Sequence, residues 1–184
     1  MIQLRRINAI TRDLLEQIVP GYSSDAVYKA AKSESGHQLI FTLTLEKLGQ
    51  PFVKKHQYLD PSILAHYNDV ATQGLSYGAF SGDQCIGFVL AEVQHWNLAL
   101  VVREFGVLPE MREQGIGKML MAKLIEDARS SSLRCVFCET QTSNLAAIEF
   151  YKKQGFVVEG FDMSFYSNQD AQQCEVALFL RKFL

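Results

Sequence analysis

The chain has 184 residues, of which 48% are hydrophobic and 21% charged, a composition that predicts one globular domain over residues 1–184. The formal net charge of -2 gives no bulk attraction to phosphate backbones or anionic lipids, so neither nucleic acid nor membrane is an expected partner. No apolar run of about 18 residues occurs, and the first residues lack the apolar stretch of a signal peptide, so we expect a cytoplasmic protein.

The first part of the chain has short and irregular hydrophobic patterns. The elements expected there are, in chain order, a strand at 2–5, a helix at 11–18, a helix at 24–31, an apolar segment at 39–45 and a helix at 61–71. The first helix should end before Pro20 and Gly21.

From residue 76 the hydrophobic pattern becomes regular. Strands are expected at 76–80, 85–93, 99–107, 135–139, 156–166 and 175–183, with helices at 115–131 and 144–154. A turn at 81–83 makes the first two strands a hairpin, and the polar segment at 167–173 reads as a loop. The sequence therefore predicts an α/β protein of the α+β type, with a single mixed, mostly antiparallel twisted sheet of about seven strands flanked by helices.

Metal chemistry is not expected. Cys135 and Cys138 match the C-x-x-C spacing, but residues three apart in a strand point to opposite faces and do not share an ion, so buried thiols are the better interpretation. The histidines are scattered along the chain without the spacing of metal ligands, at His37, His56, His66 and His95.

A glycine loop before the longer of the two later helices has the composition of an anion site. Gly115 and Gly117 tolerate positive φ and let an anion approach the backbone amides. Lys118 adds a positive charge where the helix dipole already favours an anion. A turn that only joins strand to helix is the alternative. A Rossmann fingerprint would need a third glycine, and a P-loop would need Ser or Thr where Met119 stands.

A second motif begins the following helix. Asn144 and Tyr151 are seven residues apart, close to two helical turns, so their side chains face the same way and can line one groove. The alternative makes Asn144 an N-cap and Tyr151 a packing residue.

Taken together in this order, the two motifs resemble those of the general N-acetyltransferase (GNAT) superfamily. They read Val107-Leu108-Pro109-Glu110-x-Arg112-x-x-Gly115-Ile116-Gly117-Lys118-x-Leu120 and Asn144-x-x-Ala147-x-x-Phe150-Tyr151-x-x-x-Gly155-Phe156. The resemblance covers about residues 76–160, the expected cofactor-binding core, and implies the N-acetyltransferase fold with acetyl-CoA as co-substrate.

The resemblance also implies which residues bind the cofactor. They are Phe105, Gly106, Val107, Arg112, Glu113, Gln114, Gly115, Ile116, Gly117, Lys118, Asn144, Ala147 and Tyr151. The cofactor should lie where the strand at 99–107 splays from the strand at 135–139, with the thioester held by backbone near Phe105 and Val107. Tyr151 should lie near the sulfur as general acid.

A closer likeness to the streptothricin acetyltransferases is visible in three places. They are Trp96-Asn97, the junction Glu139-Thr140-Gln141-x-x-Asn144, and the tail from Gly155-Phe156 to Tyr166. Where those enzymes often carry two consecutive acids on the cofactor strand, this chain keeps Glu104 and replaces the second acid by Phe105. The likeness suggests a streptothricin-like antibiotic as acceptor.

Acetyl transfer to an amine also needs a base, because a lysine-like amine with a pKa near about 10.4 is almost fully protonated at neutral pH. The candidates are Glu104 and Glu139, which are acidic residues in otherwise apolar strand segments. Salt bridging for Glu104 and hydrogen bonding to the following loop for Glu139 are equally good interpretations, so the base remains open.

The expected function is acetyl transfer from acetyl-CoA to a primary amine by direct attack in a ternary complex. The acceptor is a small molecule or a peptide, contacted by elements within residues 8–75. The alternatives are a protein N-terminal or lysine acetyltransferase and a non-catalytic acyl-CoA-binding module. The apolar run 176–180 is either an interior strand or the interface of a homodimer.

Overall fold

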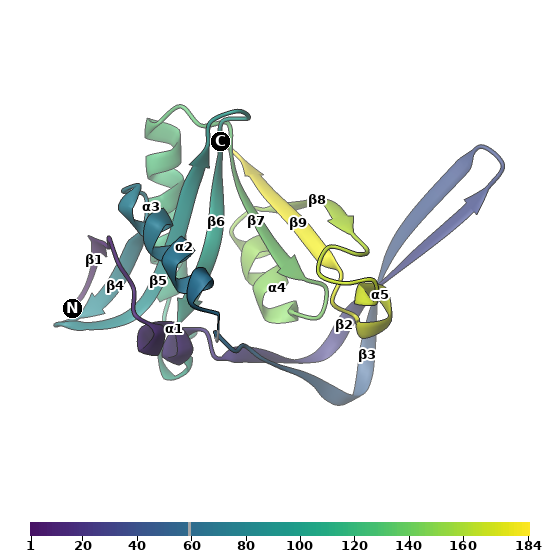
Figure 1. Cartoon of the computed structure of the whole chain (residues 1–184), viewed down its shortest axis with the longest axis horizontal. Coiled ribbons are helices and arrows are strands. Elements are labelled where there is room, and N and C mark those ends of the chain that lie inside the picture. The colour runs from purple at the N-terminus through teal and green to yellow at the C-terminus, as the bar shows by residue number, and fades with distance from the viewer. Residues whose placement is uncertain (59) are drawn as a thin grey trace. The chain divides into compact units, whose positions relative to one another are not determined.

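The computed structural model describes residues 1–58 and 60–184 (Figure 1). Its elements, in chain order, are β1 (Ile2–Arg6), α1 (Arg12–Ile18), β2 (Gly21–Ser35), β3 (Gln38–Lys55), α2 (Pro61–Thr72), β4 (Tyr77–Ser81), β5 (Gln84–Gln94), β6 (Ala99–Val107), the 3-10 helix η1 (Pro109–Met111), α3 (Ile116–Ser130), β7 (Cys135–Gln141), α4 (Leu145–Lys153), β8 (Val157–Asp162), α5 (Asp170–Gln173) and β9 (Ala177–Phe183).

Seven strands form one mixed sheet in the order β1-β4-β5-β6-β7-β9-β8. The pairs β1/β4, β4/β5, β5/β6 and β8/β9 are antiparallel, whereas β6/β7 is parallel. Two parallel neighbouring strands cannot be joined by a tight turn, and helix α3 therefore makes the crossover between β6 and β7. The mixed, mostly antiparallel sheet flanked by helices is confirmed. Strands β2 and β3 make a separate two-stranded sheet that was not predicted.

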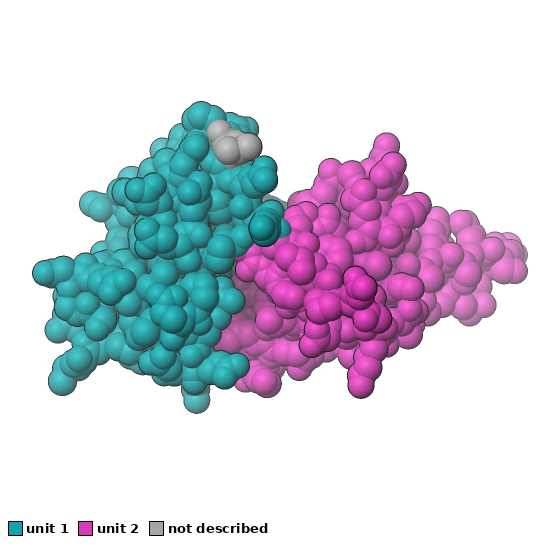
Figure 2. Space-filling model, turned by 90° about the horizontal axis from the view of Figure 1, so that it is seen from below, with its two compact units in different colours: residues 1–20, 55–138, 182–184 teal, residues 21–54, 139–181 magenta. Residues whose placement is uncertain are grey.

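The chain divides into two compact units, shown in different colours in Figure 2. Unit 1 comprises Met1–Pro20, Lys55–Cys138 and Lys182–Leu184, and unit 2 comprises Gly21–Lys54 and Glu139–Arg181. The assignment of residues 1–184 to a single N-acetyltransferase domain stays a prediction.

The core of unit 1 follows the predicted periodicities closely. Strand β5 lies between β4 and β6 and buries four consecutive side chains from Phe88 to Ala91, as expected for a central strand with both faces covered. Helix α3 buries one face, formed by Ile116, Leu120, Met121, Leu124, Ile125 and Ala128. This face covers part of the sheet, and the exposed side carries the charged residues.

The helix expected at 24–31 is wrong, because these residues lie inside strand β2 of unit 2. Ser24 and Ala26 are buried whereas Asp25 and Lys29 are exposed, an alternation with a period close to two. A local helical pattern was therefore overridden by pairing with β3, since strand propensity is decided largely by neighbours. The apolar segment at 39–45 belongs to β3.

Two further expectations concern the C-terminal part of unit 2. The segment expected as a loop at 167–173 contains the one-turn helix α5, and the strand expected to reach residue 166 ends at Asp162. The run 176–180 is an interior segment, because Val176, Leu178 and Leu180 are at most 1% exposed. Of the two interpretations of this run, the interior strand is the one observed, and a homodimer stays a prediction.

Candidate functional site

The glycine loop follows β6 in unit 1 and has the backbone of an anion-binding turn. Glu113 and Gly115 both have positive φ, at 61° and 82°. The Nε of Arg112 donates to the carbonyl oxygen of Val107 at 3.1 Å, which fixes the loop to the end of β6. A Cβ placed on Gly115 would meet no atom within 4 Å, so glycine is needed there for its dihedral angle and not for space.

The start of helix α3 supplies the donors. Gly115 is the N-cap and has no side chain to accept from the amides of the first turn. Those amides belong to Ile116, Gly117 and Lys118, and the Lys118 side chain is exposed beside them. Uncapped amides, a positive dipole end and a lysine form a donor set that fits a pyrophosphate.

The last residues of β6 present backbone amides on one side of the strand. The amide of Leu108 donates to the carbonyl oxygen of Ile86, and Val107 pairs opposite Gly87 in the antiparallel ladder. Because amides in a strand alternate in direction, the N–H groups of Phe105 and Val107 point away from β5. On this side a thioester could accept from the Val107 N–H, whereas the Phe105 N–H donates to Oε1 of Glu104. The described β6/β7 pairing runs from Ala99 to Val102, and the expected splaying of these strands stays a prediction.

Gly106 is required for close packing within unit 1. A Cβ there would lie 2.7 Å from Cγ2 of Ile18 and 2.8 Å from Cγ2 of Val19. The end of helix α1 therefore contacts the backbone of β6 directly. This contact positions the strand segment that carries three of the predicted cofactor residues.

Glu104 is held by tyrosines that sequence reasoning missed. The hydroxyl of Tyr67 donates to Oε2 of Glu104 at 3.0 Å, the hydroxyl of Tyr58 donates to the same atom at 3.5 Å, and the Phe105 amide donates to Oε1 at 3.1 Å. A register shift between Leu90 and Ala91 places a bulge just before Glu104. Burial, followed by the charge of Glu104, raises the pKa of Tyr58.

Asn144 and Tyr151 begin and nearly end helix α4 in unit 2. Oδ1 of Asn144 accepts from the amide of Ala147 at 3.2 Å, so this residue is an N-cap. Tyr151 is only 5% exposed, and its ring contacts those of Phe150 and Phe156. Both residues have the structural roles that the alternative interpretation gave them, and their contacts with the cofactor stay predictions, as does that of Ala147.

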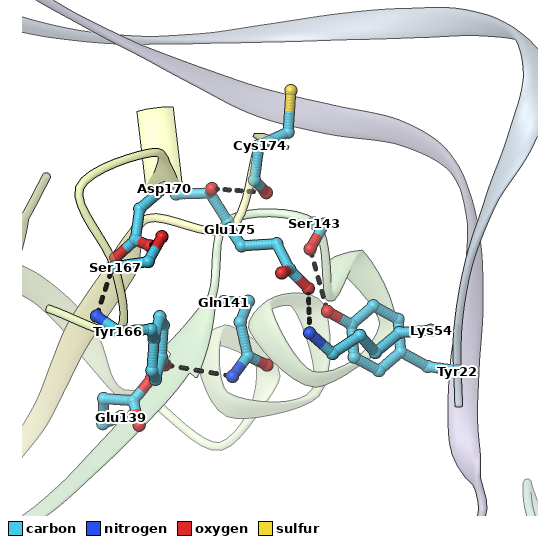
Figure 3. A network of polar contacts seen from close by, with 11 residues as sticks. Tyr22, Lys54, Glu139, Gln141, Ser143, Tyr166, Ser167, Asp170, Cys174 and Glu175 are labelled. Atoms are coloured by element: carbon cyan, nitrogen blue, oxygen red, sulfur yellow. Dashed lines mark hydrogen bonds and ion pairs between the residues drawn. The ribbon is translucent and has the colours of Figure 1, made fainter. Parts of the chain in front are cut away.

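Glu139 also accepts from a tyrosine. Figure 3 shows the hydroxyl of Tyr166 donating to Oε1 of Glu139, while Nε2 of Gln141 donates to that hydroxyl at 3.0 Å. Burial raises the pKa of Glu139, and the hydrogen bond from Tyr166 opposes the rise. Burial, together with the negative charge of Glu139, raises the pKa of Tyr166 as well.

Two more pairs lie in the same network of unit 2. The hydroxyls of Tyr22 and Ser143 are 2.8 Å apart, and Lys54 forms an ion pair with Glu175 (Figure 3). Burial raises the pKa of Tyr22 to about 12. Strands β2 and β3 thus contribute polar groups beside the carboxyl end of β7.

The predicted site residues therefore fall into two sets. Unit 1 brings together Glu104, the following β6 residues and the loop at 112–118, and unit 2 contains Glu139, Asn144, Ala147 and Tyr151. The residues missed are the tyrosines that donate to the two carboxylates, Tyr58, Tyr67 and Tyr166, whose partners lie far away in the chain. In residues 1–58 and 60–184 no group of three or more potential metal ligands occurs, and all four cysteines are free thiols.

A seven-stranded mixed sheet with an uncapped glycine loop between β6 and α3 defines the class of N-acetyltransferases. A model of the Acetyltransferase (GNAT) family matches residues 39–156, more than half of the chain, and the chain belongs to this family. At the level of the family it is therefore an acetyltransferase that uses acetyl-CoA.

Similar proteins agree with this class. Streptothricin acetyltransferase A of Bacillus subtilis (strain 168) is 29% identical over 141 residues, which cover 76% of this chain and 78% of that protein. The [ribosomal protein bS18]-alanine N-acetyltransferase of Escherichia coli (strain K12) is 27% identical over 115 residues, covering 62% and 71%. A structure from Bacillus anthracis str. Ames in complex with acetyl coenzyme A has the same fold, with a TM-score of 0.74 at 24% identity over both whole chains.

In the described part of the chain, no helix combines the length and the hydrophobicity that crossing a bilayer requires.

Proposed function

We propose that the protein transfers the acetyl group of acetyl-CoA to a primary amine of a small, basic antibiotic of the streptothricin type. The observation that carries the donor side is the loop at 112–118, whose uncapped amides and positive φ angles suit a pyrophosphate. Support for the acceptor comes from the streptothricin acetyltransferase of Bacillus subtilis, which resembles three quarters of the chain.

In this proposal the chain's own groups have three roles. The N–H of Val107, which points away from β5, polarises the carbonyl that is attacked. A carboxylate, Glu104 or Glu139, takes the proton that an ammonium must lose before its nitrogen can attack. Tyr151 returns a proton to the leaving sulfur. Acetyl-CoA supplies the activated acetyl group as a thioester, and attack is direct.

The runner-up acceptor is a protein N-terminus. It is favoured by the likeness to the bS18-alanine N-acetyltransferase, which covers a smaller share of this chain than the streptothricin enzyme does. A non-catalytic acyl-CoA-binding module is the third candidate. The two strand carboxylates, each bonded to tyrosine hydroxyls, favour catalysis over this third candidate.

The test is amine-dependent release of free thiol from acetyl-CoA. Streptothricin, an aminoglycoside, a polyamine and a peptide with an N-terminal alanine are compared, with CoA binding measured separately by calorimetry. We expect release with streptothricin above all other amines. Release with the peptide alone would establish the protein acceptor, and tight CoA binding without release on any amine would establish the module.

The role of Tyr151 is tested by Tyr151→Phe. Because Phe keeps the packing against Phe150 and Phe156 but lacks the hydroxyl, we expect kcat to fall by roughly 10²-fold while the Kd for CoA changes little. Steady-state kinetics and calorimetry measure the two quantities. Unchanged turnover would remove Tyr151 from the acid role.

A further inference from the structure

We infer that Tyr166 is a positioning residue for Glu139, and that Glu139 is the carboxylate that takes the proton of the acceptor's ammonium. The inference deepens the proposed function and rests on it, because it assigns the base that was left open between two carboxylates.

The geometry begins with the hydroxyl of Tyr166. It donates to Glu139 and accepts from Gln141, so the tyrosine stands between two residues of the same strand end (Figure 3). Chains of hydrogen bonds polarise one another, and the bond from Gln141 makes the tyrosine a stronger donor to the carboxylate. The Glu139 carboxylate is therefore fixed in direction by a group 27 residues away in the chain.

A buried carboxylate holds the loop that carries Tyr166. Asp170 is 1% exposed, and its two oxygens accept from the amide of Tyr166 at 2.8 Å and from the hydroxyl of Ser167 at 2.6 Å. Figure 3 shows this loop beside the end of β7. The turn anchored by Asp170 thus fixes the position of Tyr166, although this residue is 43% exposed.

The electrostatic surroundings suit a base. Burial raises the pKa of Glu139, which favours proton acceptance, and the hydrogen bond from Tyr166 opposes the rise. In Tyr166 from the loop after β8 and in Tyr22 from β2, the charge of Glu139 adds to burial in raising the pKa, and Glu175, which also acts on Tyr22, is paired with Lys54 of β3.

Glu104 in unit 1 fits the base role less well. Its two oxygens accept from two tyrosine hydroxyls and from a backbone amide, so fewer of its lone pairs can point toward an acceptor amine. A carboxylate so fully bonded is better suited to orienting neighbouring groups.

The reaction balances as follows. The acceptor's R–NH₃⁺ gives one proton to Glu139, and the freed nitrogen lone pair forms the C–N bond while the C–S bond breaks. The second proton lost by the nitrogen neutralises the thiolate. The products are the amide, free CoA thiol and one proton that Glu139 releases to water.

The experiment measures kcat/KM against pH for the unmodified protein and Tyr166→Phe, with the fastest amine of the panel. Removing the hydroxyl takes away a bond to the ionised carboxylate, so the pKa of Glu139 rises and the acid limb of the profile moves to higher pH. We expect a loss of roughly tenfold on the acid side, which shrinks as the pH rises. Gln141→Ala should move the limb in the same direction by less.

Two controls separate positioning from a general structural effect. Tyr28→Phe removes a different hydroxyl of unit 2, which accepts from Lys152, and should leave the limb unmoved. In a Glu139→Gln background, Tyr166→Phe should cause no further loss, because the tyrosine acts through that carboxylate. An unfolding midpoint for each variant confirms that it is folded.

An unmoved acid limb in Tyr166→Phe, a loss equal at all pH values, or a full additional loss in the Glu139→Gln background would overturn the inference alone. Absence of amine-dependent thiol release from the unmodified protein would instead overturn the proposed function. The two failures are therefore distinguishable.

Discussion

Glu104 in unit 1 and Glu139 in unit 2 are both strand carboxylates bonded to tyrosine hydroxyls, yet their surroundings are built differently. The donors to Glu104 include Tyr67 on helix α2 and Tyr58 in the segment before it. The donor to Glu139 is Tyr166, which lies in the loop between β8 and α5.

The two sets of contacts suit the two carboxylates to different roles. Two hydroxyls and an amide donate to Glu104 and orient its carboxylate, as suits a residue that shapes its surroundings. At Glu139 burial raises the pKa, and the hydrogen bond from one tyrosine, Tyr166, lowers it again. Such opposed effects suit a group that must gain and lose a proton.

The largest change in kcat/KM is expected when the carboxylate charge of Glu139 or of Glu104 is removed, each in a separate variant. Glu139→Gln should lower kcat/KM by roughly 10²- to 10⁴-fold, the usual contribution of a general base, and should abolish the acid limb of the pH profile. Glu104→Gln keeps an acceptor oxygen for the tyrosines, so we expect a smaller loss with the limb preserved. Initial rates of thiol release across pH measure both.

The reverse order, with the limb lost in Glu104→Gln and kept in Glu139→Gln, would exchange the two roles. A useful control is an acceptor whose amine has a low pKa, because such an amine is already neutral and needs no base. With it, the loss in Glu139→Gln should shrink strongly.

The second prediction tests how tightly helix α1 packs against β6 at Gly106, two residues after Glu104. In Gly106→Ala the new Cβ would meet Ile18 at 2.7 Å and Val19 at 2.8 Å, so helix α1 must shift. We expect a loss of about 1–3 kcal/mol in the free energy of unfolding, measured by urea denaturation.

Gly49→Ala is the matched control for this substitution. A Cβ at Gly49 of β3 would meet nothing within 4 Å, and we expect a change within about 0.5 kcal/mol. Equal free energies of unfolding for Gly106→Ala and Gly49→Ala would show that α1 and β6 are less tightly packed than the distances indicate.

The smallest effect concerns the loop that carries Tyr166. Burial opposes ionisation of Asp170, but hydrogen bonds from Ser167 and from nearby amides outweigh it and lower the pKa below its ordinary 3.8. A depressed pKa contributes stability above the unfolded value that is lost as the pH falls through the folded value. We therefore expect the protection of the Tyr166 amide against hydrogen exchange, measured relative to the intrinsic rate at the same pH, to fall in acid.

Asp170→Asn should exchange faster at neutral pH and lose the acid-dependent step, because it cannot ionise. Asp162→Asn is the control, since Asp162 is exposed and holds only the neighbouring Ser164. If Asp170→Asn showed the same acid-dependent change in exchange at the Tyr166 amide as the unmodified protein, the change would have to arise from a group other than Asp170.

The comparison also shows how far prediction from sequence reached. Strand β6 and helix α3 were placed almost to the residue, because their hydrophobic periods are strong and glycine marks the boundary. The helix at 24–31 was wrong because pairing with β3 overrode the local pattern. Tyr67 and Tyr166 were missed because their partners lie 37 and 27 residues away.

The family and its acetyl donor can be inferred from the sequence alone, since glycines at a strand–helix junction and the motif after them are local features; binding of the donor by this loop stays a prediction. Which tyrosine accompanies which carboxylate is visible only in the folded chain. A hydrogen bond between distant segments depends on strand register and on how one loop is anchored, and neither leaves a periodic signal in the chain. The choice between Glu104 and Glu139 as base therefore rests on contacts that a linear pattern does not contain.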